Sequence, residues 1–351
     1  MAEMQPTTEI LTRISKNSLN NKDEVFTRLF RYLLREDIWF EAYRNLYANN
    51  GASTKGVNDD TADGFSERKI QKITEQLKNG KFNPTPVRRT YIQKKNSNKM
   101  RPLGIPTFTD KLVQEAVRMI LEAIYEPIFH ECSHGFRPNR SCHTALKSLR
   151  MKFTGAKWFI EGDIKGCFDN INHDVLIGIL NKKIKDARLI QLIQQFLKAG
   201  YLEDWIYHRT YSGTPQGGII SPILANIYLH ELDKFVENLK EEFDKPSKEK
   251  YTPEYRKAKY QTEKARKAIR ECDPQDYERK KQLIKNLKAV RSVQLKTPCK
   301  SQTDKKIQYI RYADDFILSV NGSREECIKI KKKLSQYISE VLKMQLSDEK
   351  T

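Results

Sequence analysis

The chain has 351 residues, 38% of them hydrophobic, with 16 Tyr and 15 Phe, which is typical of a globular protein of two or more packed units and not of a disordered chain. A formal net charge of +19 favours a polyanionic partner, nucleic acid first, over a merely solvated basic surface or a membrane-surface protein. The six scattered cysteines contain no CxxC pair, which argues against a zinc site. Neither a signal peptide nor an apolar run of about 20 residues occurs, so we expect a cytoplasmic protein without membrane contact.

The first part of the chain reads as helical. Between residues 24 and 47, apolar residues recur every three or four positions, at Phe26, Leu29, Phe30, Leu33 and Leu34. Residues 49–65, rich in Gly, Asn and Asp, predict a loop. Residues 66–82 predict an amphipathic helix that ends near the glycine at position 80.

Strand and helix signals then alternate. Residues 85–106 predict a β-hairpin with a polar turn at 96–98 and basic residues on both sides, and 109–126 predict a helix stopped by Pro127. Residues 157–168 predict a short buried strand with an acid at its far end. The segment 221–243 predicts a helix with Ser221 as N-cap and Pro222 at its first position.

Residues 237–306 break this pattern, with 21 Lys and Arg against 12 Asp and Glu and few large apolar residues. We interpret them as a charged helical or loop insertion outside the core, and both a solvated spacer and a direct RNA contact remain open. Apolar strands around YADD and a final helix over 325–344 follow.

Acidic residues occur where apolar strands end. Asp163 lies at the end of the apolar strand within 157–168. Asp314 and Asp315 lie where the chain would reverse between two strands. Adjacent carboxylates are costly to bury because they lose water and repel each other. If the strands are neighbours, the three acids meet at one sheet edge, where Mg²⁺ would offset their charge and two such ions would serve phosphoryl transfer. A plain polar hairpin turn is the alternative for the Asp-Asp pair alone.

Six blocks, in order, resemble the reverse transcriptase of a bacterial group II intron, also called its maturase: RPLGIPTFTDKLVQEAV (101–117), HGFRPNRSCHTAL (134–146), EGDIKGCFDNINHDVL (161–176), GTPQGGIISPILANIYLHELD (213–233), YIRYADDFILS (309–319) and LSDEKT (346–351). The resemblance implies an α+β right-hand polymerase with an antiparallel palm sheet packed on helices. It divides the chain into a helical N-terminal region with fingers (1–155) and a palm (156–351) that carries the 237–306 insertion. Family members continue into a thumb and often further modules, so we expect a fingers-and-palm fragment.

The resemblance also assigns the metal site. Asp163 and Asp314 match the metal-binding carboxylates of the family, and Asp315 is the second acid of the pair. The backbone carbonyl of Ile164 would be a further Mg²⁺ ligand. Lys350 matches a family lysine near the triphosphate, a candidate proton donor to the pyrophosphate leaving group.

Further roles follow from the same blocks. Phe168 matches the aromatic residue that excludes a ribose 2′-hydroxyl, Lys94 and Arg101 would contact the triphosphate, and Gln216 and Gly217 of PQGG would touch the nascent pair. Other basic residues of the hairpin would contact the template RNA: Arg88, Lys95 and Lys99. Two residues of the FDxIxH pattern are interpreted as structural: Asn170 and His173.

The implied reaction is RNA-templated addition of dNTPs to the 3′-hydroxyl of a primer DNA, with Mg²⁺ as cofactor. The implied partners are the template and the group II intron RNA, whose splicing and mobility the family assists. The alternative for this chain is a non-catalytic RNA-binding splicing module that keeps the palm as a scaffold. A homodimer, the RNA element recognised and the activity left without a thumb stay open.

Overall fold

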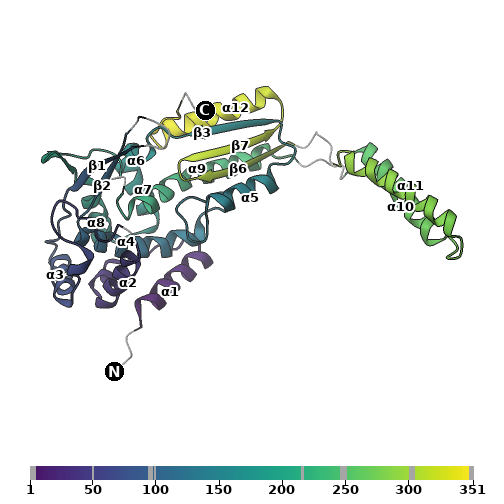
Figure 1. Ribbon diagram of the computed structural model, residues 1–351. Helices are drawn as coiled ribbons and strands as arrows, with labels where there is room; N and C mark the ends of the chain where they lie inside the picture. Colours follow the sequence, from purple (N-terminus) through teal and green to yellow (C-terminus); the bar gives the residue numbers. More distant parts are fainter. Residues whose placement is uncertain are drawn as a thin grey trace.

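The computed structural model of the protein describes residues 5–49, 51–93, 98, 100–214, 217–245, 251–299 and 305–347. Its helices and strands build two β-sheets, a helical layer and a separate helical hairpin (Figure 1). In chain order the elements are α1 (Thr7–Asn20), η1 (Phe30–Leu34), α2 (Glu36–Tyr47), η2 (Ala62–Gly64), α3 (Glu67–Lys78), β1 (Val87–Gln93), β2 (Met100–Ile105), α4 (Phe108–Tyr125), η3 (Glu126–Ile128), α5 (Cys142–Lys152), β3 (Trp158–Asp163), α6 (Cys167–Asn170), α7 (His173–Lys183), α8 (Ala187–Lys198), β4 (Tyr201–Glu203), β5 (Ile206–His208), α9 (Ser221–Phe243), α10 (Pro253–Arg270), α11 (Tyr277–Lys296), β6 (Lys306–Tyr312), β7 (Asp315–Asn321) and α12 (Arg324–Glu340).

The three-stranded sheet is antiparallel, in the order β3-β7-β6. Side chains alternate between its faces, so Tyr309, Leu318 and Ile160, which oppose one another across the strands, share one buried face. Against this sheet α9 packs on β6 and α12 packs on β3. Gly162 lies on the same face and leaves room for the Phe316 ring, because a Cβ atom there would lie 2.1 Å from it.

The opposite face of this sheet is partly covered as well. Helix α5 packs on β6, and Ala145 and Phe153 form a small apolar cluster with Ile310. The register places Asp163 and Asp315 on this second face, at the end of the strands. The sheet therefore has helices on both faces, and the end of the strands that carries the acids opens onto a cavity.

The four-stranded sheet has the order β2-β1-β4-β5. The predicted hairpin is present as β1 and β2. Strand β4 pairs with β1 in parallel, although it lies after residue 155 in the sequence. Strands β4 and β5 have three residues each, which is too short for a recognisable alternation, and their turn is formed by Asp204 and Trp205, both with positive φ.

Helices α1, α2 and α4 form the layer beneath the first strands, with Trp39, Leu112 and Ile120 in the core. Helix α4 begins where the Thr107 side chain accepts a hydrogen bond from the Asp110 amide, and it ends before Pro127 as predicted. The helix predicted within 24–47 begins only at Glu36, after a 3₁₀ turn, and α1 was not predicted. Helix α9 has its predicted bounds, but Ile220 and not Ser221 is its N-cap.

Helices α10 and α11 pack on each other and stand apart from the sheets (Figure 1). Of the helical and loop forms that the sequence left open for the charged insertion, the structure has the helical one over Pro253–Arg270 and Tyr277–Lys296. Its expected start at residue 237 falls inside α9, however, where Leu239 is still buried. Among the described residues, no helix is both long enough and apolar enough to cross a membrane.

Candidate active site

A cavity of about 670 Å³ lies where the two sheets approach each other. Its walls come from β2, from the α6 region, from the start of α9 and from the β6–β7 turn. Most of the predicted site residues in the described ranges line it together: Arg101, Asp163, Ile164, Phe168, Gly217, Asp314 and Asp315. Lys94, Lys95, Lys99, Gln216 and Lys350 lie outside the described residues.

The strand order brings the acids together. Because β3 pairs with β7, Asp163 lies directly opposite Asp315, and Asp314 precedes Asp315 in the β6–β7 turn. Ala313, the first residue of this two-residue turn, has φ +56°, a left-handed conformation that L-residues adopt at a cost. The surroundings must therefore hold the turn in place.

A buried arginine lies beneath the turn. Arg311 has no exposed surface, and its Nη1 donates to the Ala313 carbonyl oxygen at 2.8 Å. Its Nε and Nη2 donate to the two carboxylate oxygens of Asp233 at 2.8 and 2.6 Å. Burial alone would lower the pKa of Arg311, but the Asp233 carboxylate raises it, so the guanidinium stays charged. Asn226 and Ser133 accept its remaining hydrogen bonds, at 3.1 and 2.9 Å.

The segment at 132–135 supports the same turn from its other side. Arg311 exchanges backbone hydrogen bonds with Cys132 and His134, at 2.8 and 2.9 Å. Gly135 follows, and a Cβ atom on it would lie 2.3 Å from the Ala313 amide nitrogen. Only glycine permits this approach, which explains one glycine of the HGF block in packing terms.

Residues 345–347 run beside the end of β3. The Lys165 amide donates to the Gln345 carbonyl at 2.9 Å, and the Ser347 amide donates to the Asp163 carbonyl at 2.8 Å. In this antiparallel pairing the carbonyl of Ile164 points away from residues 345–347, toward the β7 side, where Asp314 and Asp315 lie. That orientation suits a backbone ligand to a metal held by the acids.

The donor atoms at this edge fit Mg²⁺ in kind. Carboxylate and carbonyl oxygens line a cavity with room for phosphates, as hard cations require. Among the described residues, no three His, Cys, Asp or Glu side chains already converge closely enough to hold a metal ion.

The field of the acids reaches a buried thiol. Burial, and after it the carboxylates of Asp314, Asp163 and Asp169 against the opposing charge of Arg311, raise the pKa of Cys167 to about 12. The thiol stays protonated, so Cys167 is no nucleophile at neutral pH.

Phe168 is half-buried at the cavity wall, and its backbone is fixed by residues 212–214. The Thr214 amide donates to the Phe168 carbonyl at 2.6 Å, and the Gly213 amide donates to the Ile171 carbonyl at 2.8 Å. His173 Nε2 donates to the Gly213 carbonyl at 2.7 Å, so this histidine has the structural role expected of it.

The basic residues divide between cavity and scaffold. Arg101 lies on β2, exposed and opposite Ile92, at the cavity. Arg88 instead donates from Nε and Nη2 to the carbonyls of Lys55 and Gly56, which ties β1 to the preceding loop.

The supporting residues were missed by the sequence reading. These residues are Arg311, Asp233 and Asn226, which do not line the cavity and are not neighbours in the sequence. Only Arg311 is marked by the sequence pattern, as a lone charge within an apolar strand. A charge in such a position needs a buried partner, but the partner lies 78 residues earlier, beyond the reach of local patterns.

Comparison with known proteins gives this geometry a family. Residues 92–249 match the model for reverse transcriptase (RNA-dependent DNA polymerase). The chain is 62% identical over 348 residues to group II intron-encoded protein LtrA of Lactococcus lactis subsp. cremoris, covering 99% of this chain and 58% of that protein. It is 33% identical to the putative COX1/OXI3 intron 2 protein of Saccharomyces cerevisiae, over 97% of this chain and 39% of that protein.

Protein YkfC of Escherichia coli K12 is 32% identical over 92% of this chain and 78% of its own length. Among solved structures, a chain of a partial Cas6-RT-Cas1–Cas2 complex matches with a TM-score of 0.42 and 18% identity, over 89% of this chain and 42% of that one. With six sequence blocks in order and the α+β arrangement of two sheets around an acidic cavity, the chain belongs to the reverse transcriptase family of group II introns.

Proposed function

We propose that the chain is the fingers-and-palm part of an RNA-directed DNA polymerase encoded by a group II intron. The observation that carries the proposal is the meeting of Asp163, Asp314 and Asp315 at one end of a three-stranded sheet, in a cavity that also holds Phe168 and Arg101. The family match supports the same reading. The chain spans 58% of the length of its Lactococcus relative, so its activity, substrates and partners are stated here as proposals.

The metal would be held by the carboxylates of Asp163 and Asp314, with Asp315 and the Ile164 carbonyl completing the set. When bound, Mg²⁺ supplies the positive charge that activates a primer 3′-hydroxyl and stabilises the leaving oxygen. The residues of the chain do the positioning. The β3–β7 pairing and the Arg311–Asp233 pair hold the acids at one fixed edge.

Substrate selection is assigned to the opposite wall. Phe168 would lie beneath the incoming sugar and exclude a 2′-hydroxyl, while Arg101, together with Lys94, would neutralise the triphosphate. Gln216 and Gly217 would contact the new base pair. Lys350 would protonate the pyrophosphate, and Lys95 and Lys99 would contact the template backbone.

A second candidate function is RNA binding that assists splicing, without catalysis. The observation that favours it is the helical hairpin, with seven Lys and Arg against two acids in α10 and seven against one in α11. Both functions are compatible with the +19 charge, but only the polymerase needs the acids. We place both in a bacterial cytoplasm, acting on intron RNA, primer DNA and dNTPs.

Extension of a DNA primer on an RNA template with Mg²⁺ separates the two. If the chain is a polymerase, the wild type should extend the primer and Asp314→Ala should not, while both bind RNA with equal affinity. Absence of extension by the wild type, alongside tight and salt-sensitive binding of intron RNA, would leave only the splicing role.

A further inference from the structure

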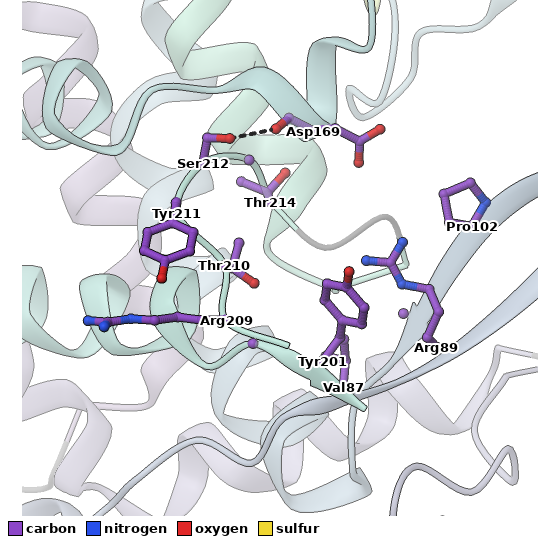
Figure 2. A pocket seen from close by; sticks show the side chains of 13 residues that line it. Val87, Arg89, Pro102, Asp169, Tyr201, Arg209, Thr210, Tyr211, Ser212 and Thr214 are labelled. Atoms are coloured by element: carbon purple, nitrogen blue, oxygen red, sulfur yellow. Dashed lines mark hydrogen bonds between the residues drawn. The ribbon is translucent and has the colours of Figure 1, made fainter. Parts of the chain in front are cut away.

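A second cavity, here called the side pocket, adjoins the catalytic one. It has a volume of about 360 Å³, within the range of sites for small molecules, and Pro102 and Asp169 line both cavities. Figure 2 shows Arg89 and Tyr201 rising from the strands toward the segment at 209–214. No role has been assigned to it so far.

The wall formed by 209–214 is fixed to the catalytic site. Besides the hydrogen bonds from Gly213 and Thr214, Ser212 Oγ donates to the Asp169 carbonyl at 3.1 Å (Figure 2). Gly213 has φ +84°, and a Cβ atom there would lie 2.6 Å from the same carbonyl oxygen. The side pocket is therefore a formed cavity, because its walls are tied to the backbone next to Phe168.

Its floor is a stack of planar groups. The Arg89 guanidinium carbon lies 3.7 Å from the centre of the Tyr201 ring, and that ring stacks on His208 with centroids 4.9 Å apart. Planar guanidinium and aromatic groups are the surfaces on which proteins stack unpaired bases. At the rim, Arg209 lies over Tyr211, which is 79% exposed.

Polar atoms in the side pocket lack partners. Thr214 is only 2% exposed, and its Oγ1 has no hydrogen-bond partner among the described residues; the same holds for the buried Nε of Arg89. Buried polar atoms are nearly always satisfied, so an orphaned hydroxyl and an orphaned N–H in one cavity point to a ligand with complementary groups.

We propose that the side pocket binds one unpaired nucleotide of the strand that enters the catalytic cavity. The base would stack on Arg89, its edge would pair with Thr214 Oγ1, and Arg209 would meet the phosphate. Asp169, the acid in the lining, would favour a base edge with donors. The strand assignment rests on the proposed function, whereas the base-binding chemistry rests on the cavity alone.

The test measures binding without Mg²⁺ or dNTPs, by fluorescence anisotropy. The probes are a blunt RNA–DNA duplex and the same duplex with an unpaired RNA overhang. The variants are Thr214→Val, which keeps the shape and removes the hydroxyl, and Arg89→Gln; the control is Arg68→Gln, on the exposed side of α3. From stacking energies we expect Arg89→Gln to weaken overhang binding about tenfold, and Thr214→Val to weaken it about threefold.

The blunt duplex and the control should show no change, and Thr214→Val should melt no lower than the wild type, since the hydroxyl it removes is unpaired. Equal losses on both duplexes, or no loss on the overhang, would overturn the proposal. If free dNTP displaced the RNA overhang with an affinity equal to that of the overhang itself, the assignment of the side pocket to the strand would be overturned. Asp314→Ala must bind like the wild type. Discrimination of the overhang by a wild-type protein that extends no primer would refute the polymerase and leave the side pocket standing.

Discussion

Asp163 and Asp315 oppose each other across adjacent strands, and carboxylates so placed repel unless a cation or a proton offsets their charge. Glu161 lies two residues earlier on the same face of β3, exposed and outside the cavity. The proposed metal site thus depends on the position of an acid along the strand, and not on the acidity of the strand as such. The expected effects of substituting Phe168 and His230 likewise depend on where each residue lies in the fold.

Phe168 gives a first prediction. Replacing it with Ala should admit ribonucleotides, because the aromatic wall beneath the sugar is lost while the backbone bonds to Thr214 remain. The measurement is the ratio of dNTP to rNTP incorporation in primer extension, which should fall by about tenfold or more for a contact worth above about 1.4 kcal/mol. An unchanged ratio would contradict the assignment of Phe168.

His230 gives a prediction about pH. Burial lowers the pKa of His230 to about 3, and its Nδ1 has no partner among the described residues. Below pH 6.5 the unfolded chain binds a proton here that the folded chain does not, so stability falls with falling pH, by about 1.4 kcal/mol per unit down to about pH 3.

The phenylalanine variant His230→Phe keeps the ring contact with Phe129 and removes the titration. Its unfolding free energy should therefore fall less steeply than that of the wild type between pH 6.5 and 5, as measured by urea denaturation. Parallel pH profiles would show that His230 is not the group responsible.

At the scale of elements, the β6–β7 hairpin is the part that must not move. Its turn has a left-handed Ala313, and it is held from below by Arg311 and from the side by Gly135. A fully buried ion pair is maintained here although burying two charges is expensive, since the pair also satisfies the turn carbonyl.

Removing one partner of that pair should be worse than removing both. Arg311→Met leaves the Asp233 carboxylate buried and uncompensated, for which we expect a loss of about 3–5 kcal/mol of unfolding free energy. The double variant Arg311→Met with Asp233→Leu should recover a large part of it. Chemical denaturation of these two variants and of Asp233→Leu alone measures this, and strictly additive losses would show that the two residues are not coupled.

Elements with strong local signals were predictable: the β1–β2 hairpin, α3, α4, α9 and the strands around YADD all occur where expected. The short β4 and β5 and the Asp233 partner of Arg311 were not, because three-residue strands have no period and long-range pairs leave no local mark. The strand patterns predicted that Asp163 and Asp314 meet at one edge only on the condition that their strands are neighbours, which the β3–β7 pairing fulfils, whereas the side pocket required the fold.

At the scale of the whole molecule, charge is distributed unevenly. Residues 246–304 carry 17 Lys and Arg against 8 Asp and Glu, which is +9 of the total of +19. The chain leaves and re-enters the sheet region at one point, where the Lys245 amide donates to the Lys305 carbonyl at 2.9 Å. The hairpin of α10 and α11 is thus an addition to a fold that closes without it.

Replacing residues 246–304 with a two-residue Asn-Gly turn should leave the melting temperature within about 4 °C, because the sheets lose no packing. Binding to RNA should weaken and depend less on salt, since fewer phosphates are neutralised. Calorimetry and binding at several salt concentrations measure both. A large drop in melting temperature would mean that the hairpin supports the fold, and an unchanged salt slope would identify it as a spacer.

The central claim is that acids at one edge of the sheet serve catalysis. Single-nucleotide addition on an RNA template with Mg²⁺ tests it most directly, with Asp163→Asn compared to Glu161→Gln, its neighbour on the same face of β3. We predict that Asp163→Asn loses addition by at least about a thousandfold while Glu161→Gln keeps it, and that both bind the primer–template duplex alike. Equal activity of the two variants would contradict the account.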